Sequence, residues 1–122
     1  MSAGDRPILL VEDNPMDVDL TLRAFKRRRV TNTIHVARDG EEALAWMARW
    51  QAGEPWPAVI LLDLKLPKVD GLEVLRQLKQ HPALRVIPVV VLTTSGESAD
   101  VQTAYQLGVN SYIVKPAEFE KF

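Results

Sequence analysis

Four short apolar runs, each followed by polar residues, constrain the fold of this chain more than any other feature. They lead into Glu12-Asp13, Asp63, Thr93-Thr94 and Lys115-Pro116, and helix-length amphipathic stretches separate them. Runs of Val, Ile and Leu bounded by turn residues are typical of buried parallel strands. The ligand site of an open parallel sheet lies at the carboxyl ends of its strands. The sequence therefore predicts that three carboxylates, a hydroxyl and an amine meet at one site.

The predicted strands and helices alternate along the whole chain. We expect strands at about Pro7–Glu12 and Thr33–Ala37, and further strands that end at Asp63, Thr93 and Lys115. This alternation predicts an α/β three-layer sandwich with a five-stranded parallel sheet. We take the strand order 2-1-3-4-5 from known doubly wound sheets and do not derive it from the pattern. The intervening helices are expected to begin after the cap residue Asn14, at Asp39, at Gly71 and at Glu97.

The composition indicates one globular domain, residues 1–122. Apolar residues make up 47% of the 122 residues and charged residues 25%, which is ordinary for such a domain. The net charge of −1 creates no field that would recruit nucleic acid or an anionic membrane, and no apolar stretch is long enough to span a bilayer. The absence of cysteine excludes disulfides and thiolate metal sites. We expect a cytoplasmic protein without nucleic-acid or membrane partners. Because only six residues follow Pro116, we expect the last helix to be short or missing.

The acidic residues at the strand ends predict a metal-dependent phosphoryl-transfer site. Taken alone, Glu12-Asp13 also suits a helix N-terminus, and Asp63 is also a common turn former. Taken together, close carboxylates repel one another unless a hard cation such as Mg²⁺ lies among them. A carboxylate in that setting can attack a phosphoryl group. Lys115 and Thr93, which alone would be a solvated lysine and a strand residue, then supply a charge and a hydroxyl for the phosphoryl oxygens.

These motifs resemble the response-regulator receiver domain of two-component signalling, which has a CheY-like (flavodoxin-like) fold. The likeness covers nearly the whole chain. Within the family, residues 60–71, 90–95 and 107–116 are most similar to stand-alone receivers paired with bacterial phytochrome histidine kinases. The residues that carry the family resemblance are Glu12-Asp13, Asp63 with Pro67 and Gly71 after it, Thr93 with Thr94 and Ser95, and Lys115-Pro116.

The resemblance implies a phosphorylation-controlled switch without an output domain. It would catalyse only its own phosphorylation and dephosphorylation, and a kinase phosphohistidine would supply the phosphoryl group. Phosphorylation would change partner binding or self-association. The site residues implied are Asp63 as phosphoacceptor; Glu12, Asp13, Asp63 and the backbone carbonyl of Lys65 around Mg²⁺; Lys115 and Thr93 on the phosphoryl group; and Thr93 with Tyr112 as the switch pair.

The resemblance also implies partners. A sensor histidine kinase, such as a bacteriophytochrome, would dock around Met16, Asp17 and Leu20 and on the Pro116-Ala117 loop, and related receivers often form homodimers. The Lys115-Pro116 bond is expected to be cis. Lys65 departs from many family members, which carry a neutral or acidic side chain there. We hypothesise that its charge alters hydrolysis of the acyl phosphate.

Three other functions were weighed against this one. An aspartate-nucleophile phosphatase requires a second acid two residues after the nucleophile, where this chain has Lys65, and a cap domain. A flavodoxin-like FMN carrier requires a Gly- and hydroxyl-rich phosphate loop after the first strand. This chain has Glu12-Asp13-Asn14-Pro15 there, which would repel phosphate unless a cation is present. A receiver that never accepts phosphate would lack some site residues, and all are present. Other candidate features have structural explanations: Lys26–Arg29 suits a helix C-terminus, Trp46, Trp50 and Trp56 suit packing of the second helix, and His35 and His81 lie away from the acidic strand ends.

Overall fold

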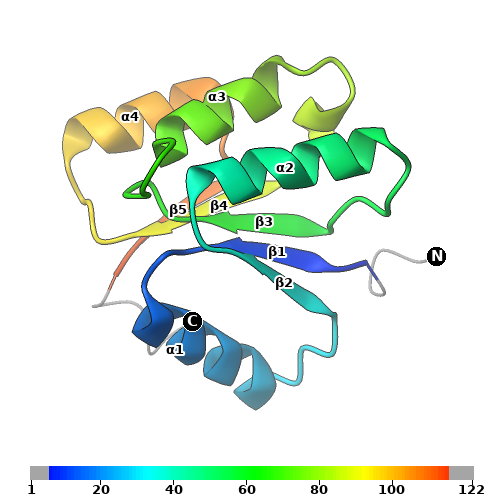
Figure 1. Ribbon diagram of the computed structural model, residues 1–122. Helices are drawn as coiled ribbons and strands as arrows, with labels where there is room; N and C mark the ends of the chain where they lie inside the picture. Colours follow the sequence, from blue (N-terminus) through cyan, green and yellow to red (C-terminus); the bar gives the residue numbers. More distant parts are fainter. Residues whose placement is uncertain (1–5, 116–122) are drawn as a thin grey trace.

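A computed structural model describes residues 6–115 of the protein. It forms a parallel five-stranded sheet with helices on both faces (Figure 1). The sheet order β2-β1-β3-β4-β5 and the α/β sandwich confirm the predicted fold. The predictions for the last helix and the Lys115-Pro116 bond lie outside the described residues. The strands are β1 (Ile8–Val11), β2 (Ile34–Ala37), β3 (Val59–Leu62), β4 (Val89–Thr93) and β5 (Ser111–Val114).

Four helices and one short 3-10 turn connect these strands. Helices α2, α3 and α4 cover one face of the sheet, and α1 lies on the other (Figure 1). Their N-termini follow the sequence signals. Asn14 caps α1 by accepting hydrogen bonds from the amides of Met16 and Asp17, and Asp39 caps α2 through the amide of Glu42. The bounds are α1 (Pro15–Arg27), α2 (Gly40–Gln51), α3 (Gly71–Gln80), η2 (Leu84–Val86) and α4 (Ser98–Leu107).

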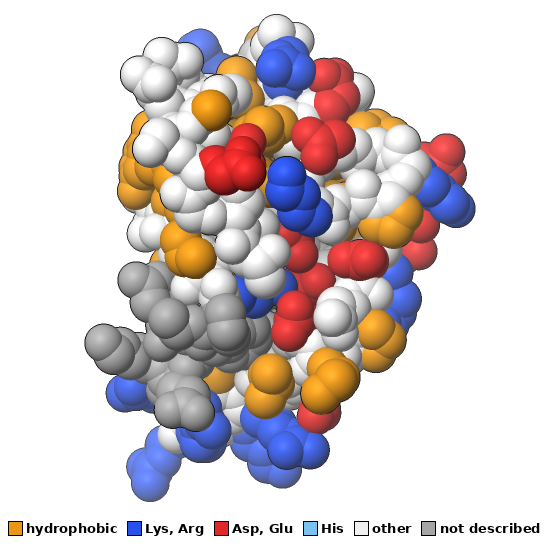
Figure 2. Space-filling view, turned by 90° about the vertical axis from the view of Figure 1, so that its left-hand side faces the viewer, with side chains coloured by type: hydrophobic (Ala, Val, Ile, Leu, Met, Phe, Trp, Pro, Cys, Tyr) orange, Lys and Arg blue, Asp and Glu red, His pale blue; other side chains and the backbone are white. Residues whose placement is uncertain are grey.

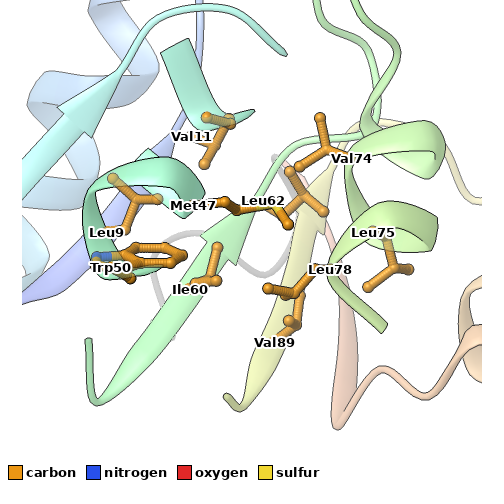
Figure 3. Close-up of a pocket in the computed structure, with 11 residues that line it drawn as sticks. Leu9, Val11, Met47, Trp50, Ile60, Leu62, Val74, Leu75, Leu78 and Val89 are labelled. Carbon is orange, nitrogen blue, oxygen red and sulfur yellow. The ribbon is translucent and has the colours of Figure 1, made fainter. Parts of the chain in front are cut away.

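The core consists of two apolar clusters, one on each face of the sheet. Side chains alternate along β1, so that Leu9 and Val11 belong to the cluster under α2 and α3, whereas Ile8 and Leu10 belong to the cluster under α1. The larger cluster surrounds a small cavity of about 10 Å³ (Figure 3). Its lining is apolar, and we expect it to be dry because a buried water needs polar partners.

The three tryptophans pack around α2, as predicted. Trp50 is buried in the larger cluster, and Trp46 and Trp56 are partly buried against it. Trp46 stacks on His35 with 4.5 Å between the ring centroids, and the Trp56 indole donates a hydrogen bond to the Trp50 carbonyl. These contacts lie away from the acidic strand ends and anchor α2 to the sheet.

Candidate functional site

The polar residues predicted at the strand ends do meet at one edge of the sheet. Glu12-Asp13 follows β1, Asp63 follows β3, Thr93 ends β4 and Lys115 follows β5. The ends of β1 and β3 lie side by side, because Val11 pairs with Leu62. Figure 2 looks onto this edge and shows acidic side chains gathered around a hollow that also holds Lys or Arg groups. The parallel topology thus brings together residues that are far apart in the sequence.

Lys115 is the positive centre of this site. Its side chain is 2% exposed, and its ammonium lies 2.5 Å from Glu12 Oε1, 2.8 Å from Asp17 Oδ2 and 3.5 Å from Asp63 Oδ2. Burial lowers the pKa of Lys115, but its hydrogen bonds with Asp17 and Glu12 outweigh that effect and hold the pKa above its usual range. The amine therefore stays charged and partly neutralises three carboxylates.

Asp63 is held in one orientation by hydrogen bonds to a single oxygen. Its Oδ1 accepts from the Thr93 hydroxyl at 2.7 Å and from the backbone amide of Lys65 at 3.1 Å. Its Oδ2 faces Lys115. Because Oδ1 already has two donors, Oδ2 is the oxygen with lone pairs available toward the centre of the site.

Gly71, the first residue of α3, fixes the backbone of Asp63. The Gly71 amide donates to the Leu64 carbonyl at 3.0 Å. A Cβ at this position would overlap the Asp63 carbonyl oxygen and the Leu64 Cα. The start of α3 can therefore approach the backbone of Asp63 and Leu64 this closely only when residue 71 is glycine.

Glu12 is a buried carboxyl whose ionisation is costly. It is 2% exposed, and burial raises its pKa to about 7, with the nearby Asp63 charge adding to the rise and Lys115 opposing it. Both of its oxygens have partners, since Oε1 contacts Lys115 and Oε2 accepts from the Asn14 amide at 3.2 Å. The site thus has an excess of negative charge once Glu12 is ionised.

The carboxylates fit a hard divalent cation. Glu12, Asp13 and Asp63 each offer an oxygen within 4.8 Å of the others, and Asp13 is exposed to solvent. Carboxylate oxygens together with waters are the ligands that Mg²⁺, Mn²⁺ and Ca²⁺ prefer. A cation here would favour the ionised form of Glu12, whose pKa is raised first by burial and then by the Asp63 charge. The predicted cluster is thus a candidate metal centre; the part of the Lys65 carbonyl in it stays a prediction.

Thr93 and Tyr112, the predicted switch pair, are connected through Ser95. The Tyr112 hydroxyl donates to the Ser95 carbonyl at 2.6 Å, and the Ser95 amide reaches the Thr93 hydroxyl oxygen at 3.5 Å. Burial raises the pKa of Tyr112, so that its hydroxyl remains a donor. The backbone of Ser95 therefore links the two residues of the predicted switch pair.

Two contacts at the site were missed by sequence reasoning. Asp17 was expected only on a docking surface, yet it binds Lys115. Ser95 was noted only as a small residue, yet its hydroxyl lies 2.5 Å from Asp100 Oδ2. The sequence did offer a signal for these contacts, because Asp17 lies in the first turn of α1 and Asp100 in the first turn of α4, and both helices start at this edge of the sheet.

The predicted docking residues on α1 are accessible. Met16 is 73% exposed and Leu20 43% exposed, and Asp17, which follows Met16 in α1, contacts Lys115 at the site. Pro116 and Ala117, the other predicted docking residues, lie outside the described residues. Within residues 6–115, no helix is long and apolar enough to cross a membrane.

Comparison with known proteins agrees with the fold. The family model of the response regulator receiver domain matches residues 8–122. A probable methanogenesis regulatory protein, FilR2 of Methanothrix harundinacea, is 51% identical over 114 residues, which are 93% of this chain and 74% of that protein. The response regulator Rcp1 of Synechocystis sp. is 47% identical over 112 residues, 88% of this chain and 75% of that protein.

Solved structures show the same likeness. The Mn²⁺-bound form of Rcp1 superimposes with a TM-score of 0.87 at 42% identity, covering 95% of this chain and 88% of that one. The phosphorylated cyanobacterial phytochrome response regulator RcpA has a TM-score of 0.86 at 43% identity, covering 96% and 85%. The bacteriophytochrome response regulator AtBRR has a TM-score of 0.83 at 53% identity, covering 97% and 87%. Among these structures, that of Rcp1 is a Mn²⁺-bound form and that of RcpA is a phosphorylated form.

Proposed function

The chain belongs to the response regulator receiver domain family, whose members are phosphorylation-controlled signalling switches, and from this premise we propose that Asp63 is its phosphoacceptor. One observation supports this most strongly. Asp63 is buried among the site residues with Oδ1 held by Thr93 and the Lys65 amide, and with Oδ2 facing the Lys115 ammonium. An oriented carboxylate beside a cation is what phosphoryl transfer requires, since positioning and charge neutralisation dominate that reaction.

In the proposed reaction, Asp63 Oδ2 attacks the phosphorus of a histidine kinase phosphohistidine. The new P–O bond forms as the P–N bond breaks, and the released imidazole takes up a proton. Lys115 binds a phosphoryl oxygen, and the Thr93 hydroxyl moves from Asp63 Oδ1 to another. A divalent cation held by Glu12, Asp13, Asp63 and the Lys65 carbonyl supplies charge neutralisation when it is bound, and we propose Mg²⁺ as that ion.

The switch follows from the same contacts. Movement of the Thr93 hydroxyl toward the phosphoryl group changes the position of its partner, the Ser95 amide. Tyr112 donates to the Ser95 carbonyl, and its ring is expected to follow. The chemical change at Asp63 is thereby transmitted to the surface between α4 and β5.

We propose that residues 1–122 act as one receiver domain. The names of the similar solved structures support a bacteriophytochrome histidine kinase as the phosphoryl donor. That kinase would contact Met16, Asp17 and Leu20 on α1, together with Pro116 and Ala117. We further propose that the protein works in the cytoplasm, forms a homodimer, does not bind nucleic acid, and turns over no substrate beyond its own phosphoryl group.

Phosphorylation by acetyl phosphate tests this proposal directly. The protein is incubated with acetyl phosphate and MgCl₂, and its intact mass is read beside that of Asp63→Asn. We expect one added phosphoryl group, which is absent from Asp63→Asn and from a sample containing EDTA. An adduct that persists in Asp63→Asn would contradict the assignment of Asp63, and the absence of any adduct under rapid sampling would contradict the proposed function.

A further inference from the structure

Lys65, Ser95 and Asp100 form a polar chain that the phosphorylation chemistry does not require. Asp100 lies in the first turn of α4, and its Oδ2 accepts a hydrogen bond from the Ser95 hydroxyl at 2.5 Å. The Lys65 ammonium lies 3.8 Å from the same oxygen. One carboxylate oxygen therefore connects the loop after the phosphoacceptor with the loop between β4 and α4.

Ser95 is held from two sides. Its hydroxyl binds Asp100, while its carbonyl accepts the hydroxyl of Tyr112 at 2.6 Å. Ser95 itself is buried, and the side chain of Asp100 is only 18% exposed. The carbonyl of Ser95 can accept from Tyr112 only when its loop adopts this conformation, and the hydroxyl contact with Asp100 favours that conformation.

We propose that Asp100, supported by Lys65, is a positioning residue that shifts the resting switch toward the conformer in which Tyr112 is bound to Ser95. The claim deepens the proposed function and rests on it, because Tyr112 matters only if it reports phosphorylation. The unphosphorylated protein therefore already populates the conformer in which the Tyr112 hydroxyl is bound to the Ser95 carbonyl. The Lys65–Asp100 pair adjusts the fraction of molecules in that conformer.

The expected size of this bias follows from the exposure of the groups. The side chain of Lys65 is 63% exposed, and ion pairs of this kind change an equilibrium by at most about fivefold. The Ser95–Asp100 hydrogen bond has a charged acceptor and little exposure, which corresponds to about tenfold or more. Loss of Asp100 should therefore affect Tyr112 more strongly than loss of Lys65.

Fluorine NMR of the unphosphorylated protein tests the proposal. The chain has two tyrosines, so 3-fluorotyrosine in a Tyr105→Phe background labels Tyr112 alone. We expect Asp100→Ala to lower the ratio of bound to unbound Tyr112 by about tenfold and Lys65→Met by about two- to fivefold. Asp100→Glu should restore part of the bound signal. High salt should mimic Lys65→Met in the wild type and have little further effect in that variant.

Asp19→Asn is the matched control, because it removes an equally charged partner from an exposed pair on α1, Arg23–Asp19 at 3.0 Å. Its Tyr112 signal should equal that of the wild type. A wild-type Tyr112 signal in folded Asp100→Ala and in Lys65→Met would overturn the proposal. If Asp100→Ala does not fold, Lys65→Met decides, because that exposed side chain supports no core packing.

The intact mass after acetyl phosphate treatment is recorded for the same samples. The NMR measurement needs no phosphoryl group, so the two proposals fail separately. A Tyr112 shift without a phosphoryl adduct would reject the phosphoacceptor assignment alone. An adduct on Asp63 with an unaltered Tyr112 signal in both variants would reject the positioning role alone.

Discussion

Raising the pH in the absence of divalent cations should destabilise the folded protein, and Glu12→Gln should remove most of that effect. Glu12 is buried, and its pKa rises from the usual 4.5 to about 7 in the folded chain. A carboxyl group whose pKa is raised by folding binds its proton more tightly in the folded state. Its contribution to stability is therefore fully present below about pH 4.5 and is lost as the pH rises through about 7.

The magnitude follows from the difference between the two pKa values. At about 1.36 kcal/mol per pKa unit, the rise from 4.5 to about 7 corresponds to about 3 kcal/mol between pH 4.5 and pH 8. This is a large share of the roughly 5–15 kcal/mol that stabilises a typical domain. A divalent cation should recover much of the loss at pH 8, because it favours the ionised carboxylate.

Urea unfolding between pH 5 and pH 8, with EDTA and then with MgCl₂, measures the effect. We expect the free energy of unfolding of the wild type to fall with pH in EDTA, and that of Glu12→Gln to change much less. Glu41→Gln, at an exposed glutamate, is the control and should follow the wild type. Equal pH profiles for the wild type and Glu12→Gln, or a wild type more stable at pH 8 than at pH 5, would refute the reasoning.

Three further predictions concern stability near the site. Gly71→Ala should destabilise the fold by about 2–4 kcal/mol in urea unfolding because its Cβ would overlap the Asp63 carbonyl, whereas Gly96→Ala, with only ordinary contacts, should be nearly neutral. Lys68 has a φ of 70°, which glycine adopts without strain. In urea unfolding, the free energy of unfolding of Lys68→Gly should therefore exceed that of Lys68→Met by about 1 kcal/mol, and the reverse order would contradict a strained backbone there. Lys115→Met leaves three carboxylates without their cation, so it should lower the free energy of unfolding by about 3–5 kcal/mol at neutral pH and by less with MgCl₂. Thermal unfolding measures this loss, and an unchanged Tm would show that Lys115 does not compensate the carboxylates.

Local signals in the sequence predicted most of the fold. The apolar runs that became β1, β3 and β4 are short, buried and bounded by turn residues, and Asn14 and Asp39 cap the helices that follow. The strand order was taken from known folds, because periodicity states which residues are buried and not which strands are neighbours.

The meeting of the candidate metal ligands with Thr93 and Lys115 was predictable, because parallel strands end at one edge of the sheet. The surroundings of these residues were not. The close approach of Gly71 to Asp63, the path from Asp100 to Ser95, and the support from Lys65 all depend on how α3 and α4 meet the loops beside them. No periodic pattern encodes such contacts.

The sequence by itself determined the α/β class and the set of polar residues at the strand ends, because alternation of burial and the polarity of parallel strands are local properties of the chain. The tertiary structure alone decided which of those residues touch. Lys115 binds Asp17 across 98 positions of sequence and Asp63 across 52. These pairs form because the β2-β1-β3-β4-β5 sheet and the start of α1 enclose the Lys115 ammonium. Burial strengthens its attraction to each nearby carboxylate, because charges interact more strongly away from water.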